Sequence, residues 1–499
     1  MAEYYLGIDC GTQSVRAVLF DRHGETVRQA RAGLTVMEPR PGWSEQDPAQ
    51  WWGSLCSVLR AVMRGTKRGS LAGMGLAYQR ETFVVLDNQG LAVRPAILWN
   101  DQRAGREIEE MSRDLGGEWF HRTTGKFLDT TPSAPKIKWM AAHEPHLFSR
   151  TDKLLDVGAY LHWRLTGEMT SPLAGADTLG MMDIGNSTWS ARIAEYLGLP
   201  FSALPTVVAS GSLAGKISPE AAKMTGLPAG LPVIAAGGDG QVFAVGAGAL
   251  DPGSIALNLG TAVTLGVHAT ECLISPYFRT MSAVLPGHYY NESVLRAGAQ
   301  IISWFGVNFG TDPAVLDEKC SAISPGCDGL ITIPYWKGGM MPYNDPGARG
   351  MTIGWSNYHT KAHFYRSLLE GIAFELRLML EGHQLASRAG AHHIRLGGGG
   401  AASVLWARII SDVTGLEIAL SKSVENTALG AAMIAAWGVG AGGLREVSAA
   451  MDRISGRTVP NQQSHERYSE IFEQIYKDLY PVMREKLVTW GAWTLERVE

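Results

Sequence analysis

Four glycine-rich turns carry most of the side chains that could do chemistry in this sequence. They read IDCGTQS, AGGDGQ, LNLGTA and LGGGGAAS, and each follows a short apolar run typical of a buried strand. Backbone N–H groups and hydroxyls in such turns can bind phosphate, and an aspartate there can hold Mg²⁺ or accept a proton. One such turn is ordinary turn chemistry, but four together favour a phosphate-binding site.

The first of these turns places a carboxylate, Asp9, near the end of an apolar strand. Burial of a carboxylate is costly unless a positive or hydrogen-bonding group meets it. After the turn the chain returns as a second strand, VRAVLFD, and then a third, TVRQARAGL. A P-loop or dinucleotide-binding fold would instead continue into a helix. The hairpin therefore argues against both folds.

Two other glycine-rich segments look like nucleotide motifs but fail on spacing or context. GSLAGKIS (211–218) resembles a Walker A loop, yet its glycines are one residue too close and Ile217 replaces the required hydroxyl, so we expect a surface turn. GVGAGG (438–443) follows a helical pattern and is expected to be a helix terminus. Neither HExxH nor a Cys/His cluster with metal spacing occurs.

Length and composition indicate a protein of two large domains. The chain has 499 residues, 45% of them hydrophobic, which exceeds what a single core usually holds. A net charge of -4 gives no reason to expect nucleic acid or a membrane surface as partner. Five scattered cysteines and the unremarkable N-terminus MAEYYLGID predict a cytoplasmic location. The uncharged stretch 427–444 is expected to be a buried helix, and the oligomeric state stays open, a homodimer included.

An internal repeat suggests two related α/β domains with a boundary near residue 246. ALNLGTAVTLGV repeats the pattern of LGIDCGTQSVRAVLF, a strand, a Gly-Thr turn and a strand. Helices are expected at 47–65, with Asp47 as N-cap, and at 360–388. A strand, a turn and a helix are expected over 394–415, and an amphipathic helix at the C-terminal end.

Beyond the four turns, several segments resemble the FGGY family of carbohydrate kinases over nearly the whole chain. These segments are WSEQDPAQWW (43–52), PAILWNDQRA (95–104), TPSAPKIKWM (131–140), YLHWRLTGE (160–168), PYWKGGMMPYNDPGARG (334–350) and ENTALGAAM (425–433). The first two look most like xylulose kinases, whereas QRETFVVLD (79–87) looks like glycerol kinases. Thr131 stands where glycerol kinases place a tyrosine that touches substrate, so the resemblance leaves the substrate open.

The resemblance implies a fold and a set of site residues. The fold is α/β, with two ribonuclease-H-like domains of the actin/Hsp70/sugar kinase superfamily flanking a cleft. Residues 1–246 would bind sugar and supply the catalytic base, Asp239, and residues 247–499 would bind nucleotide. Asp9 would hold Mg²⁺, through water. The residues implied for ATP are Thr12, Gln13, Ser14, Gly260, Thr261, Gly398, Gly399 and Ala402.

On the substrate side, the candidate residues are Arg80, Glu81, Trp99, Asp101, Asp239 and Gln241. Arg80 and Glu81 offer donors and acceptors to a polyhydroxyl compound, and the alternative is that this pair is a solvated strand end. The implied activity is ATP- and Mg²⁺-dependent phosphorylation of a small sugar or polyol. A ketopentose such as D-xylulose leads, glycerol or a tetritol is the alternative, and an actin- or chaperone-like ATPase is the alternative of another class.

Overall fold

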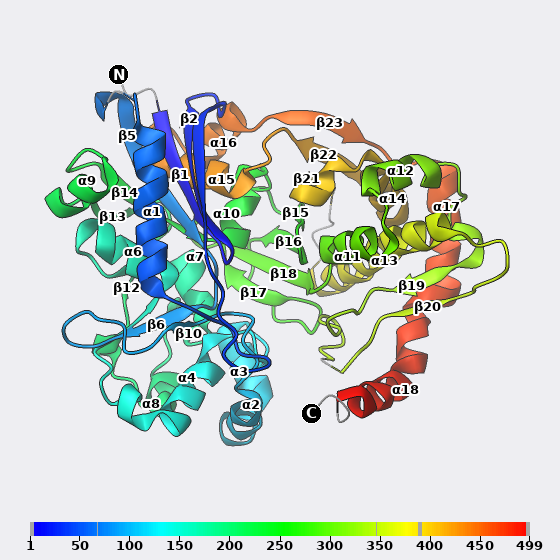
Figure 1. The fold of residues 1–499 in the computed structure, drawn as a ribbon, viewed down its shortest axis with the longest axis horizontal. Helices are drawn as coiled ribbons and strands as arrows, with labels where there is room; N and C mark the ends of the chain where they lie inside the picture. The colour runs from blue at the N-terminus through cyan, green and yellow to red at the C-terminus, as the bar shows by residue number, and fades with distance from the viewer. Residues whose placement is uncertain (1–3, 67, 346, 388–391, 496–499) are drawn as a thin grey trace.

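The chain folds around two mixed β-sheets, one from each half of the sequence (Figure 1). The structure is a computed structural model that describes residues 4–66, 68–345, 347–387 and 392–495. In the colouring of Figure 1, the blue-to-green elements form the first sheet and most of its surroundings and the green-to-red elements form the second, while an orange helical segment of the second half lies beside the first sheet. The site lies where the two halves meet.

The first sheet is built on the three-stranded meander that the sequence predicts. The order across the sheet is β13 (Leu213–Lys216), β14 (Pro232–Gly238), β5 (Leu71–Tyr78), β1 (Tyr4–Cys10), β2 (Ser14–Asp21) and β3 (Thr26–Gly33). Strands β1, β2 and β3 pair antiparallel in sequence order, whereas β5 pairs parallel with β1, and β14 pairs parallel with β5. The carboxyl ends of β1, β5 and β14 therefore open at one edge.

The second sheet repeats this arrangement, which confirms the expected pair of ribonuclease-H-like domains. Its order is β17 (Arg279–Ser282), β18 (Tyr289–Leu295), β16 (Val263–Ala269), β15 (Ser254–Leu259), β21 (His393–Gly397), β22 (Glu417–Ser421) and β23 (Ile454–Thr458). Strands β15, β16 and β18 form the antiparallel meander, and β21 and β22 run parallel to β15. An antiparallel edge strand closes each sheet on the far side, β13 on the first and β23 on the second.

Two helices lie between the sheets, and each packs against the sheet of the other half of the sequence. Helix α10 (Asp239–Gly246), from the first half, packs Phe243 and Ala247 against Tyr290 of the second sheet. Helix α15 (Asn426–Gly438), from the second half, packs a face of small residues against the first sheet. The two helices also pack on each other. Each half of the sequence thus contributes a helix to the core of the other half.

The outer faces of the sheets are covered by the longer helices. In the first domain these are α1 (Pro48–Met63), α6 (Val157–Thr166) and α9 (Pro219–Thr225), and Asp47 caps α1 as expected. In the second domain they are α11 (Ala299–Phe309), α12 (Pro313–Cys320), α13 (Lys361–Ala386), α14 (Val404–Thr414) and α17 (Gln462–Ile471). The helix α16 (Leu444–Met451) packs on α15.

A smaller layer of short elements extends the first domain beyond the β5–β6 turn. Its sheet has the order β4 (Glu45–Gln46), β7 (Ala96–Ile97), β6 (Phe83–Leu86) and β8 (Lys153–Asp156). Its helices are α2 (Gly105–Met111), α3 (Gly117–Thr124), α4 (Ser133–His143), α5 (Pro145–Phe148), α7 (Leu173–Ala176) and α8 (Ala191–Leu197). The strand pairs β9 (Thr170–Pro172) with β12 (Thr206–Val208), β10 (Met182–Asp183) with β11 (Thr188–Trp189), and β19 (Ile331–Ile333) with β20 (Met351–Ile353) complete the strands.

One local expectation is corrected by the structure. The segment 211–218 is not only a surface turn, because residues 213–216 form the edge strand β13 by pairing with β14. The C-terminal segment is helical as expected, with a π-helical turn, Phe472–Tyr476, between α17 and α18 (Lys477–Leu495). The stretch 427–444 contains α15, which is buried as expected. Within the described ranges, no helix has the length and apolar character that crossing a membrane requires.

Candidate active site

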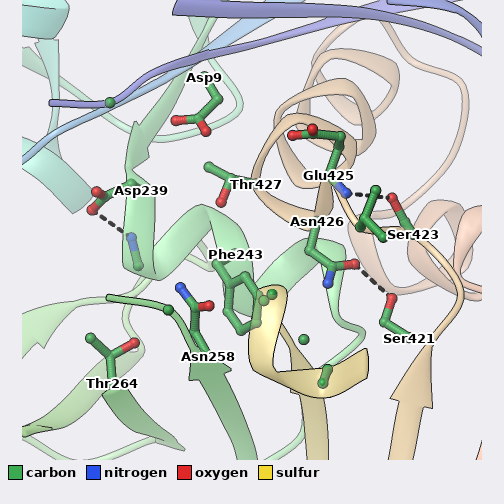
Figure 2. A pocket seen from close by; sticks show the side chains of 18 of the residues that line it. Asp9, Asp239, Phe243, Asn258, Thr264, Ser421, Ser423, Glu425, Asn426 and Thr427 are labelled. Carbon is green, nitrogen blue, oxygen red and sulfur yellow. Dashed lines mark hydrogen bonds between the residues drawn. The ribbon is translucent and has the colours of Figure 1, made fainter. Parts of the chain in front are cut away.

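A cavity of about 620 Å³ lies between the two sheets and gathers most of the glycine-rich turns that the sequence singles out. Asp9, Gly11 and Asp239 line it from the first domain, and Gly260, Gly398, Gly399 and Ala402 line it from the second. Figure 2 shows that Asn258 and Thr264 enter it from the second sheet and that Asn426 and Thr427 enter it from the start of α15. The cavity is thus a cleft lined by strand ends of both domains.

Asp9 sits at the carboxyl end of β1, where its side chain is 13% exposed. Its cationic neighbour is Arg16 on the adjacent strand β2, whose Nη1 lies 3.7 Å from Asp9 Oδ2 and 3.1 Å from Glu425 Oε2. Burial raises the pKa of Asp9 to about 7, and Arg16 offsets only part of this rise. The structure therefore holds a carboxylate that gains from an additional positive charge in the cavity.

Asp239 begins helix α10, directly after the parallel strand β14 ends. Its Oδ1 accepts the Gly240 N–H at 2.8 Å and lies 2.9 Å from Arg80 Nε. Oδ2 has no hydrogen-bond partner among the described residues, and the side chain is 40% exposed. Burial raises the pKa of Asp239, and Arg80 opposes this shift. One oxygen is therefore held in place, while the other is left without a protein partner in a side chain that lines the cavity.

The residues predicted to bind phosphate differ in their exposure and in the space around them. Gly398 has φ +85° and a Cβ there would lie 2.3 Å from Asn258 Oδ1, so this position requires glycine for its own conformation. Gly399 has open space around it, and Ala402 is exposed at the cavity wall. Thr261 is exposed beside Gly260, and its carbonyl oxygen accepts the N–H of Gly298.

The turn after β1 is held by hydrogen bonds that leave few of its side chains free. The Thr12 hydroxyl donates to Gln79 Oε1 at 3.0 Å and accepts from Trp99 Nε1 at 2.9 Å. Gln13 is exposed, and Ser14 is buried at the start of β2. Gly11, rather than Thr12, Gln13 or Ser14, lines the cavity.

Arg80 and Glu81 are buried, so the alternative of a solvated strand end is wrong. Their side chains are 8% and 4% exposed. They lie in the turn between β5 and β6, and Glu81 has φ +54°, a left-handed conformation that is strained for a non-glycine residue. Strain of this kind concentrates at functional sites.

The other substrate-side candidates are placed unequally. Gln241 is buried, and its Oε1 accepts from Arg80 Nη1 at 3.4 Å. Trp99 is partly exposed and bonds to Thr12. The carboxylate of Asp101 accepts the backbone N–H groups of Ser44 and Arg103 and two guanidinium N–H groups of Arg103, and it is 0% exposed. Asp101 thus serves this local pair. Like Glu81, Trp99 and Gln241, it is not among the residues that line the cavity.

Two charged residues of the second domain, Arg279 on β17 and Glu292 on β18, join this cluster although the sequence interpretation did not select them. Glu292 Oε2 lies 3.0 Å from Arg80 Nη1, and Arg279 Nη1 lies 2.7 Å from Glu81 Oε1. The sequence does contain a signal for them, because each of these two strands carries a single charged residue. Sequence alone does not show that these strands reach the β5–β6 turn.

The fold and the cavity define a two-domain phosphotransferase, and comparison with known proteins gives its family. Residues 4–246 match the N-terminal domain of the FGGY family of carbohydrate kinases, and residues 255–439 match the C-terminal domain. The chain therefore belongs to the FGGY family of carbohydrate kinases. It is an ATP-dependent kinase of a carbohydrate.

Individual relatives and solved structures are similar over almost the full length. The chain is 30% identical to the xylulose kinase of Escherichia coli K12, over 96% of this chain and 100% of that protein. It is 29% identical to the glycerol kinase of Alkalilimnicola ehrlichii, over 88% and 91%. The crystal structure of xylulose kinase from Rhodospirillum rubrum superposes with a TM-score of 0.89 at 28% identity, covering 97% of this chain and 99% of that one.

Proposed function

We propose that the protein transfers the γ-phosphate of ATP to a hydroxyl of a small neutral polyol, with a ketopentose such as D-xylulose as the leading substrate. The observation that carries the proposal is that Asp9 and Asp239 open into one cavity lined by glycine-rich turns of both domains. Carboxylates and phosphate-binding turns in one cleft supply the parts that phosphoryl transfer needs. Similarity to xylulose kinases supports the choice of substrate.

In this proposal Asp239 is the general base. Its Oδ2 accepts the proton of the attacking hydroxyl, because Oδ1 is already held by the Gly240 N–H and by Arg80. The raised pKa of Asp239 makes it a stronger base than an ordinary aspartate. The backbone N–H groups of the turns at Gly260 and Gly399 hold the phosphates, whereas the N–H of Gly11 is donated to the Ser14 carbonyl.

The residues around Asp9 fit a magnesium ion. Mg²⁺ binds proteins through one or two carboxylates and completes its shell with water and substrate phosphate oxygens. Asp9 offers such a carboxylate inside the cavity, and its pKa of about 7 shows that a further positive charge would stabilise its ionised form. The described residues contain no cluster of three or more metal-ligating side chains, so Asp9 would share the ion with the phosphates. When bound, the ion neutralises developing charge on the phosphates.

The charges beside the cavity favour a neutral substrate. Arg80 pairs with Asp239 and Glu292, and Arg279 pairs with Glu81 and Glu292. Both arginines of this cluster therefore have carboxylate partners in the described structure, and neither is left to bind a substrate carboxylate. The acceptor oxygens that remain suit hydroxyl groups.

Each of two alternative functions has one specific observation in its favour. The Arg80–Glu81 pair resembles glycerol kinases, which makes glycerol or a tetritol the second candidate substrate. An ATPase of the actin or chaperone class would share the two-domain architecture of the fold. The buried Arg80–Glu81 pair beside Asp239 argues against it, since an ATPase that acts on water needs no such site.

The test is ADP formation by the purified protein with ATP and Mg²⁺ in the presence of D-xylulose, glycerol, erythritol or gluconate. We expect turnover with D-xylulose well above the rate without acceptor, and no stimulation by gluconate. Preference for glycerol or erythritol would replace the leading substrate while keeping the reaction. ADP formation that ignores every polyol would overturn the kinase proposal.

A further inference from the structure

A pair of strands from the second domain reaches the proposed polyol site of the first. Strands β17 and β18 are antiparallel, and Arg279 lies directly opposite Glu292 in their register. Their side chains face the β5–β6 turn, where Arg279 meets Glu81 and Glu292 meets Arg80. Charges of opposite sign on facing strands stabilise each other and fix the side chains.

Glu292 is the centre of this cluster. It is 0% exposed, and its Oε1 accepts from Arg279 Nη2 at 2.6 Å, Arg279 Nε at 3.0 Å and Arg80 Nη2 at 3.1 Å. Burial would raise the pKa of Glu292, but the two arginines outweigh burial and lower it. A carboxylate that is buried and ionised between two guanidinium groups fixes both of them, because charge-assisted hydrogen bonds are short and directional.

The backbone of β17 is itself attached to the first domain. The Ser282 N–H donates to Asp177 Oδ2 at 2.9 Å, and the Thr280 N–H donates to the Gly125 carbonyl at 2.9 Å. Lys126 Nζ lies between them, donating to the Thr280 carbonyl at 2.6 Å and to Asp177 at 3.2 Å. The strand is therefore fixed against the first domain, which suits a group that must hold others in place.

The cluster leaves one oxygen available at each end. Arg279 engages Glu81 Oε1, and no described residue bonds to Glu81 Oε2. Arg80 engages Asp239 Oδ1, and no described residue bonds to Asp239 Oδ2. Both ends thus present a single oriented acceptor, and Glu292 sets the positions of the two arginines between them.

We propose that Arg279 and Glu292 are positioning residues of the polyol site, which hold Glu81 and Arg80 so that the second domain selects the sugar as well as binding nucleotide. This inference rests on the proposed function. It differs from the division expected from sequence, in which residues 247–499 serve the nucleotide alone.

The test compares Glu292→Gln, which keeps the shape and removes the charge, with Glu370→Gln as control. Glu370 is equally buried in the same domain and is paired with Arg366 and Tyr468, away from the cavity. For Glu292→Gln we expect the KM for the polyol to rise about 10–100-fold with the KM for ATP changed less than about 2-fold. Glu370→Gln should leave the ratio of the two KM values at the parent value.

The pH dependence of kcat/KM separates a positioning role of Glu292 from a merely structural one, because a merely structural role would not change it. The charged groups facing Asp239 are Arg80, Arg279, Glu292 and Asp9. The charge of Glu292 raises the pKa of Asp239, so its removal lowers that pKa. The acid limb of kcat/KM should therefore move to lower pH in Glu292→Gln and stay in place in Glu370→Gln.

An unchanged polyol KM together with an unchanged acid limb in Glu292→Gln would overturn the inference. If that variant fails to fold, Arg279→Lys is measured in the same way, and a polyol KM equal to the parent value has the same consequence. Failure of the proposed function is distinguishable from failure of this inference, because it would already be measured in the unsubstituted parent enzyme. A parent that neither turns over nor binds any polyol by calorimetry overturns both, whereas normal parent turnover with an unaffected variant overturns only this inference.

Discussion

Gly246 of α10 and Gly430 of α15 face each other where the two helices cross, and neither position has room for a side chain. A Cβ on Gly246 would lie 1.9 Å from the Asn426 carbonyl oxygen, and a Cβ on Gly430 would lie 2.0 Å from that of Val242. The obstructing atoms are backbone, so they cannot rotate away. The crossing matters because α10 begins at Asp239 and α15 begins at Asn426, and both residues line the cavity.

Replacing Gly430 with alanine should therefore separate the helices and damage both stability and turnover. We expect the free energy of unfolding to fall by about 1–3 kcal/mol, as for other overpacked sites, and kcat to fall because Asp239 is displaced. Gly53→Ala is the matched control, since Gly53 lies on the exposed side of α1 with nothing within 4 Å of its Cβ position. That substitution should stabilise by about 0.5–1 kcal/mol. Urea unfolding that ranks the two variants equally would contradict the role of the crossing.

Substitution of Asp239 by asparagine tests the general base. The side-chain oxygen can still accept the Gly240 N–H, so folding and ATP binding should be near normal. Loss of the base should lower kcat by about 10²–10⁴-fold. Turnover is measured by ADP formation and ATP affinity by calorimetry. A variant that keeps more than about half of the parent activity would remove Asp239 from this role.

Much of this fold follows from patterns that are local in the sequence. A few neighbouring residues determine each of these features: the hairpins with glycine in their turns, the Asp-Pro helix start at 47–48, and the strands that end in glycine. The position of Asp239 was predictable for the same reason, because the end of a parallel strand is where ligands meet an α/β sheet.

The parts of the site that sequence did not give depend on contacts between distant segments. Arg279 meets Glu81 across 198 positions of the chain, and Glu292 meets Arg80 across 212. Asp101 shows the opposite failure, since it was expected among the substrate-side residues. Its charge is instead taken up by Arg103, two residues further on. Residue type alone does not predict which neighbouring residue a charged side chain will pair with.

The pKa of Asp9 predicts an effect on the stability of the ligand-free protein. The folded-state pKa of about 7 lies above the ordinary aspartate value of 3.8, so the folded state binds more protons between these values and loses stability as pH rises through this range. Asn at this position cannot ionise. We therefore expect Asp9→Asn to be more stable than the parent at pH 8 and close to the parent at pH 4.

The same variant should respond differently to ligand. Adding ATP with Mg²⁺ at pH 8 should raise the Tm of the parent and raise that of Asp9→Asn much less, because the charge that would hold the ion is gone. Thermal unfolding at both pH values, with and without ligand, checks both statements. A variant less stable than the parent at pH 8 would show that the ion pair with Arg16 outweighs burial.

Glu81 is expected to select the substrate through its side chain. It is buried and paired with Arg279, and a hydroxyl left without a partner in a closed site costs about 1–3 kcal/mol. Glu81→Ala should raise the KM for the true substrate about 10–100-fold and leave the KM for ATP nearly unchanged. Steady-state kinetics with each polyol measures both constants.

Two further variants separate the side chain of Glu81 from its backbone and its partner. Because glycine adopts φ +54° without strain, Glu81→Gly should be more stable than Glu81→Ala and yet show the same rise in KM. The double variant Arg80→Met with Glu81→His removes the guanidinium and the carboxylate of this pair, and it should shift preference away from glycerol or a tetritol if either is the native substrate. It should also lose kcat, because Asp239 and Glu292 lose the guanidinium that they share. Parent-like kinetics in both Glu81→Ala and the double variant would mean that this pair does not choose the substrate.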